Sequence, residues 1–127
     1  MTKSEMTGIR SLAFSKWIRQ NLPDSSNGFC VSNQDWVFWN YKTRTLMLAE
    51  EKTRFGNIST WFYRFIKEVM DPALEQFCKK NNINYLGYKI IKFENTTPDD
   101  GKIFIDDVEI KKEDFLKLFE QFQKKDV

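Results

Sequence analysis

Apolar residues recur at helical spacing in three parts of the chain. The segments predicted to form helices on this basis are 11–20, 59–80 and 112–122. The first of these helices is expected to begin as early as Lys3. Pro72 interrupts the second. Because proline lacks a backbone donor and clashes with the preceding turn, we expect a kink or a break near Met70–Asp71.

Shorter apolar runs rich in β-branched and aromatic residues lie between the helices. The runs predicted to form strands are 29–31, 34–39, 45–52, 85–93 and 103–105. The first three follow one another with only short polar connections, which predicts an antiparallel meander. Alternation of these strands with helices predicts an α/β fold with a mixed, mainly antiparallel central sheet flanked by helices.

Length and composition limit the fold more than the function. A chain of 127 residues with 41% hydrophobic content is expected to form one domain over residues 1–127. Aromatic residues make up 16% of the chain, so the core is expected to be built around rings. The 20 basic and 18 acidic residues nearly balance, so net charge alone does not indicate a nucleic-acid partner.

The residue types that are missing exclude several chemistries. The chain has no histidine, which excludes serine-triad chemistry and most zinc sites. Cys30 and Cys78 match no metal-ligand spacing, and reduced thiols are expected. The N-terminus lacks the apolar stretch of a signal peptide, and no run has the roughly 18 apolar residues of a membrane span, so a cytoplasmic location is expected.

Charged residues gather where two neighbouring strands end. Alternation along the strand 45–52 places Glu50 and Lys52 on one face and Glu51 on the opposite face. Asp35 can meet them from the preceding strand. Two carboxylates that share a site attract a hard divalent cation such as Mg²⁺ or Mn²⁺, and a neighbouring lysine can orient water or stabilise charge on a phosphate. This pattern predicts a site that cleaves phosphodiester bonds.

The order of helix, three strands bearing Asp and then Glu-x-Lys, helix and strand resembles the core of the PD-(D/E)xK nuclease superfamily, over roughly residues 3–93. The stretches 21–35 and 46–54 are similar to small phage proteins of that superfamily. The resemblance implies a restriction-endonuclease-like core of order α-β-β-β-α-β. It also implies that Asp35 and Glu50 bind the metal, that Lys52 is the catalytic lysine, and that Glu5 is an additional acid on the first helix.

The same resemblance implies a metal-dependent DNA endonuclease of phage or mobile-element type, working in the host cell cytoplasm without an organic cofactor or a membrane. A homodimer is expected, with the last strand and the aromatic final helix as its interface. The basic residues expected to flank the site and to contact nucleic acid are Lys42, Arg44, Arg54, Arg64 and Lys67.

A second copy of the motif lies later in the chain, where Asp99 is followed by Glu109 and Lys111. The residues around Asp99 and around Asp106–Asp107 are typical of tight turns, and Lys111 directly precedes the last helix. We therefore expect solvated surface at this second copy rather than a site.

Three alternatives to an active nuclease remain open. The carboxylates and the lysine can be an ordinary charged strand end. The chain can be a catalytically inactive nuclease-fold protein that binds DNA or inhibits a protein, or an interaction module without a nucleic-acid role. Four aromatic residues are candidates for stacking on bases, although their spacing favours the core: Trp36, Trp39, Trp61 and Tyr63.

Overall fold

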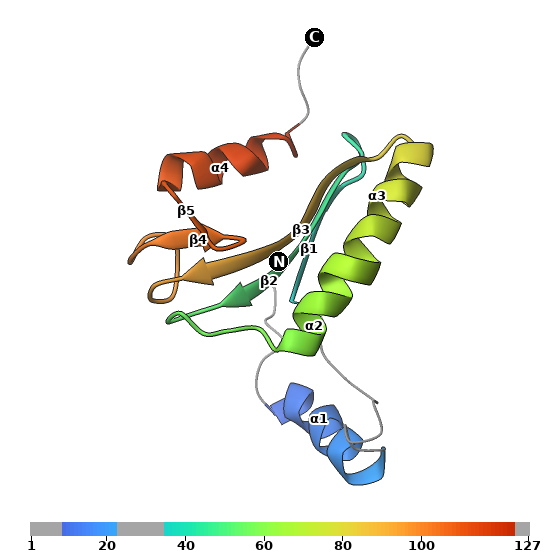
Figure 1. The fold of residues 1–127 in the computed structure, drawn as a ribbon, viewed down its shortest axis with the longest axis vertical. Coiled ribbons are helices and arrows are strands. Elements are labelled where there is room, and N and C mark those ends of the chain that lie inside the picture. Colours follow the sequence, from blue (N-terminus) through green and yellow to red (C-terminus); the bar gives the residue numbers. More distant parts are fainter. Residues whose placement is uncertain (1–8, 23–34, 124–127) are drawn as a thin grey trace. The chain divides into compact units, whose positions relative to one another are not determined.

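The computed structural model describes residues 9–22 and 35–123 of the chain, which divides into two compact units, 1–32 and 33–127. The first unit contains helix α1 (Ile9–Asn21), so a helix is confirmed here (Figure 1). Phe14 and Trp17 stack on this helix with ring centroids 6.1 Å apart. The expected positions of Lys3, Glu5, Cys30 and the strand 29–31 lie outside the described residues.

The second unit is built around a mixed sheet (Figure 1). Its elements are β1 (Trp36–Asn40), β2 (Thr45–Lys52), α2 (Thr60–Phe65), the π-helical segment η2 (Ile66–Met70), α3 (Asp71–Lys80), β3 (Asn84–Phe93), β4 (Ile103–Ile105), β5 (Val108–Ile110) and α4 (Lys112–Glu120). The strands lie side by side in chain order, and β2 runs parallel to β3 while the other neighbours are antiparallel. The predicted α/β class with a mixed, mainly antiparallel sheet is confirmed for the described residues.

The crossover between the parallel strands is one continuous helical stretch, α2–η2–α3. The irregularity expected near Met70–Asp71 takes the form of a π-helical turn rather than a break. At the end of this turn the Asp71 amide donates to the carbonyl of Ile66, five residues earlier. A π-turn is a recognised way of bending a helix, and here it immediately precedes Pro72, which cannot donate a backbone hydrogen bond.

Side chains alternate along β2 and separate two cores. On the face covered by the crossover helix, here called the crossover face, Leu48 packs with Ile66 and Tyr88. On the other face, here called the α4 face, Ala49 packs with Phe115 of α4. A residue and its neighbour on β2 therefore belong to different environments, which matters for Glu50 and Glu51.

Several aromatic side chains that the spacing assigns to the core are exposed instead. They are Trp36, Trp39, Trp61 and Tyr63. The two on β1 lie on a strand whose outer edge pairs with no described strand. The two on α2 lie beside the inward-facing Phe62, which is buried. Helical spacing predicted the helix correctly, but it did not show which of its apolar residues face the core.

The β4–β5 hairpin contains a strand, β5, that the sequence did not predict. The expected turn at Asp106–Asp107 is present. Its φ angles of 48° and 68° are positive, as in the two-residue turns that join the strands of a β-hairpin. Asp106 also ties this hairpin to β3, because its amide donates to the Ile90 carbonyl and its carboxylate accepts from the Ile90 amide. The sequence Val108–Ile110 was missed because Glu109 interrupts it, whereas the equally short β4 is a continuous apolar run.

Helix α4 packs its rings on the sheet of the same chain. Phe119 meets Phe38 edge to face, with centroids 5.1 Å apart, and Phe115 meets Phe93 in the same way at 6.3 Å. These rings of the final helix, which the sequence analysis assigned to a dimer interface, therefore pack against the sheet of their own chain. Among the described residues, no helix combines the length and the apolar character needed to cross a membrane.

Candidate active site

The structure brings Asp35 and Glu50 together at one end of the β1–β2 ladder. Trp36 lies opposite Ala49 in the antiparallel register, so Asp35, the residue before it, lies opposite Glu50. The Asp35 amide donates to Glu50 Oε2 at 3.1 Å, and the Glu51 amide donates to Asp35 Oδ2 at 2.9 Å. Each carboxylate is thus held by the backbone of the neighbouring strand.

The two carboxylates differ in environment. Glu50 is only 3% exposed, whereas Asp35 is exposed to solvent. Burial raises the pKa of Glu50 above its usual range, and the negative charge of Asp35 raises it further, although the Asp35 amide partly offsets both effects. A carboxylate destabilised by burial and by a second negative charge is stabilised by a nearby cation.

Tyr88 is a further residue of the site, and the sequence did not single it out. Its hydroxyl donates to Glu50 Oε2 at 3.3 Å, and the side chain is 2% exposed. Burial, followed by the charge of Glu50, raises the pKa of Tyr88, so the phenol stays protonated and remains a donor. Tyr88 therefore orients one oxygen of the buried carboxylate.

A bulge in β3 decides where Tyr88 points. The register changes from Leu46 opposite Tyr85 to Leu48 opposite Tyr88, so β3 carries one extra residue over this interval. Gly87 takes a φ of 109°, which side-chain-bearing residues rarely adopt. An isolated glycine inside an apolar run is a known sign of a bulge, and it was the one sequence signal available for this feature.

Lys52 lies two residues beyond Glu50 on the same strand and is half-buried. Within residues 9–22 and 35–123 its side chain forms no hydrogen bond or ion pair. Lys92, its partner in the parallel register, is held by Asn57 Oδ1 at 3.1 Å and by Asp107 Oδ1 at 3.2 Å. Of the two lysines paired at this strand end, Lys92 is bonded to other side chains, whereas the Lys52 ammonium group has no partner in the described part of the chain.

Glu51 occupies the opposite face of β2, as alternation predicted. Its Oε1 atom accepts a hydrogen bond from Trp36 Nε1 at 2.8 Å, and the side chain lines a hollow on the α4 face with Phe115. The carboxylates of Glu50 and Glu51 therefore do not form one cluster.

The described residues offer two carboxylates for a metal ion, and no group of three or more His, Cys, Asp or Glu side chains is found in the described ranges. The two strand amides bind Glu50 Oε2 and Asp35 Oδ2, so the other oxygen of each carboxylate lies outside these two backbone bonds. Hard oxygen donors suit Mg²⁺, which proteins often bind through one or two carboxylates together with substrate phosphates. The residues present fit such an ion, and the Glu51 carbonyl is a further oxygen on the same strand.

Two of the basic residues expected near the site lie at the far end of the sheet. Lys42 and Arg44 belong to the β1–β2 turn, and about five residues, or roughly 16 Å of strand, separate Thr45 from Glu50. Arg44 donates to the carbonyls of Asn81 and Asn82, at 2.8 and 3.2 Å. The expectation that these two residues flank the site is wrong, because the turn joins the opposite ends of the strands.

The other three basic residues differ in how they are held. Arg64 pairs with Glu68 at 3.1 Å on the exposed side of the helix. Lys67 donates to Asp106 and to the Tyr88 carbonyl, each at 3.2 Å, and so joins the crossover helix to β3 and the β4–β5 turn. Arg54 follows Lys52 closely and is exposed, with no side-chain bond to any described residue.

The second copy of the motif does not assemble into a site. Asp99 pairs with Lys112 at the start of α4, and Glu109 is exposed on β5, opposite Phe104. The expected solvated surface is confirmed there.

The chain matches no protein-family model and no curated protein. The geometry of the Asp35–Glu50 site is therefore the main basis for a functional proposal.

Proposed function

We propose that the protein is a metal-dependent DNA endonuclease of the restriction-endonuclease-like, PD-(D/E)xK type. The observation that carries this proposal is the pairing of Asp35 with the buried Glu50 at the end of two adjacent strands, with Lys52 two residues further along β2. The helical crossover from β2 to β3 supports it, because the resemblance implies a helix and then a strand after the Glu-x-Lys strand.

In this proposal Asp35 and Glu50 hold Mg²⁺ or Mn²⁺ through the carboxylate oxygens that the strand amides leave free. The bound ion supplies Lewis-acid activation of water and neutralises charge on the scissile phosphate. Lys52 positions the attacking water and offsets the charge that develops on the phosphate during in-line displacement. Tyr88 keeps Glu50 oriented, and Arg54 is the basic residue best placed to contact the DNA backbone.

The biological setting follows from the same resemblance and is part of the proposal. It is a phage or mobile-element protein acting on DNA in the cytoplasm of the host cell. A homodimer would allow two sites to cut two strands.

The test combines calorimetry of Mn²⁺ and Mg²⁺ binding with plasmid cleavage, on wild type, Asp35→Ala and Glu50→Ala. Glu51→Gln is the matched control, since this adjacent carboxylate faces the opposite side of the sheet. Metal binding and cleavage are both expected to disappear in the first two variants and to persist in the control. A wild-type protein that binds no metal and leaves DNA intact at millimolar metal would overturn the proposal.

A catalytically inactive binding or inhibitor protein with the same fold is the second candidate. The exposed rings of Trp36, Trp39 and Trp61 favour it, because a binding surface has a use for them and hydrolysis does not. DNA binding without metal, with an affinity that falls steeply as salt rises, would favour a DNA-binding role. No DNA binding at low salt would favour a protein partner.

A further inference from the structure

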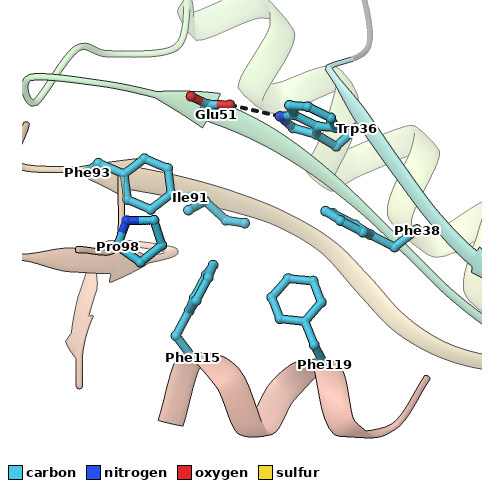
Figure 2. Close-up of a pocket in the computed structure, with 8 residues that line it drawn as sticks. All are labelled: Trp36, Phe38, Glu51, Ile91, Phe93, Pro98, Phe115 and Phe119. Carbon is cyan, nitrogen blue, oxygen red and sulfur yellow. Dashed lines mark hydrogen bonds between the residues drawn. The ribbon is translucent and has the colours of Figure 1, made fainter. Parts of the chain in front are cut away.

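A hollow of about 280 Å³ lies on the α4 face of the sheet, away from the Asp35–Glu50 site. Figure 2 shows Phe115 and Phe119 projecting from α4 toward the strands, and Glu51 joined to Trp36 by a hydrogen bond. The residues that line the hollow are Trp36, Phe38, Glu51, Ile91, Phe93, Pro98, Phe115 and Phe119.

The lining of the hollow is mainly aromatic, and one of its side chains carries a charge. Five of its eight residues carry aromatic rings, and Glu51 is the one ionisable side chain among them. Glu51 Oε1 accepts from Trp36, while its Oε2 atom has no hydrogen bond from a described residue. A carboxylate beside an apolar wall has lost part of its hydration, so a positively charged ligand is its natural complement.

The angles between the rings decide what shape of ligand fits. Neighbouring planes meet at 77° for Phe93 and Phe115 and at 66° for Phe115 and Phe119. The Phe38 and Phe119 rings meet at 70°. Trp36 and Phe38 are the nearly parallel pair of the lining, at 22°. The three steeply inclined phenylalanine pairs present ring faces and edges in several directions, which suits a compact group better than a flat base. Aromatic walls arranged in this way are how proteins recognise substituted ammonium ions.

We propose that this hollow binds a small substituted ammonium ion, with its charge toward Glu51 and its alkyl groups against the phenylalanine rings. The site is separate from the proposed nuclease site and does not depend on it.

The test titrates the protein with choline and, in parallel, with 3,3-dimethyl-1-butanol, which has the same shape but a neutral carbon in place of the nitrogen. Calorimetry gives the affinity, and the Trp36 indole N–H resonance reports whether the ligand reaches the hollow. Choline is expected to bind at least about tenfold more tightly than the alcohol.

Glu51→Gln removes the charge but keeps an acceptor for Trp36, so this variant is expected to fold and to lose the preference for choline. Glu109→Gln, on the exposed side of β5, is the matched control and should bind as the wild type does. Three results would each overturn the proposal: no choline binding by the wild type at millimolar concentration, equal binding of choline and the alcohol, or an unchanged preference in Glu51→Gln.

Discussion

Glu50 is the residue at which stability and proposed function conflict. It is a carboxylate in the polar end of an otherwise apolar strand, 3% exposed and opposed by Asp35. Neither burial nor a second negative charge favours its ionised form. Such a residue is expected where a cation binds, and it should cost folding free energy when no cation is present.

The pKa of Glu50 predicts the effect of replacing it. Because that pKa is raised above its usual value of 4.5 in the folded protein, the protonated form is favoured there. Its contribution to stability is therefore complete below pH 4.5 and is lost as the pH rises through the raised value. Glu50→Gln mimics the protonated form, so the metal-free variant should be more stable than wild type near neutral pH, by about 1 kcal/mol.

Urea unfolding of metal-free protein at neutral pH and below pH 4.5 measures this difference, which should shrink in acid. A variant that is less stable than wild type at neutral pH would show that ionised Glu50 contributes favourably to the fold.

Tyr88 should act on metal binding through Glu50. Tyr88→Phe removes the hydroxyl that donates to Glu50 Oε2, so the pKa of Glu50 should rise further. We expect Mn²⁺ affinity near neutral pH to fall about tenfold, the usual cost of losing a group that orients a ligand, with recovery at higher pH. Calorimetry across a pH series measures it.

Tyr85→Phe is the matched control for that experiment. The Tyr85 hydroxyl donates to Asp71 on the crossover helix, at 2.7 Å, and not to Glu50. An equal loss of Mn²⁺ affinity in both variants would mean that the effect comes from general destabilisation.

At the scale of elements, the β3 bulge connects backbone conformation to the site. The extra residue at Gly87 places Tyr85 and Tyr88 on the same face of the sheet, although an undisturbed strand would place them on opposite faces. This one irregularity brings the hydroxyl of Tyr88 to Glu50.

Gly87→Ala should therefore affect both stability and the site. A methyl group at this position meets only the flexible end of Lys89, at 3.4 Å, so the cost comes from the φ of 109°. We expect a loss of about 1–2 kcal/mol in unfolding free energy, together with weaker Mn²⁺ binding. Denaturant unfolding and calorimetry measure the two effects.

Gly56→Ala is the comparison variant for Gly87→Ala, because the backbone of Gly56 lies outside the left-handed region. The methyl group added at Gly56 meets the Thr53 carbonyl oxygen at 3.2 Å. If Gly87→Ala were as stable and bound metal as well as wild type, the bulge would not be needed to position Tyr88.

Beyond the single elements, the sheet gives the described part of the second unit two chemical environments. The crossover face carries the carboxylate pair and Lys52, and the α4 face carries Glu51 and the ring-lined hollow. The two faces should therefore respond independently to mutation, because the sheet lies between them.

Lysine variants on the two faces test this separation. Lys52→Met should reduce plasmid cleavage by at least about 100-fold, the typical cost of removing a group that stabilises transition-state charge, while Mn²⁺ binding is retained. Lys89→Met is the control, since Lys89 pairs across from Ala49 and belongs to the α4 face. Cleavage by Lys52→Met at the wild-type rate would remove Lys52 from the proposed mechanism.

Elements that depend on neighbours along the chain were predictable from the amino-acid sequence alone. Helical periods identified α1, the crossover helix and α4, and alternation along β2 placed Glu50 and Glu51 on opposite faces. The strand β5 was missed although β4, of the same length, was predicted, because Ile103–Ile105 is wholly apolar whereas Glu109 interrupts the short run Val108–Ile110. These predictions succeed because residues a few positions apart share a face of a helix or a strand.

Features that depend on the register between distant segments could be found only in the folded chain. Tyr88 reaches Glu50 across 38 positions of sequence, and only after a bulge changes its face. Arg44 turned out to lie at the far end of the sheet, Trp39 and Trp61 turned out to be exposed, and the rings of α4 turned out to line a hollow on their own sheet. Local pattern cannot supply these facts, because a side chain's partner across a sheet is set by the pairing of whole strands and by the helices that cover them.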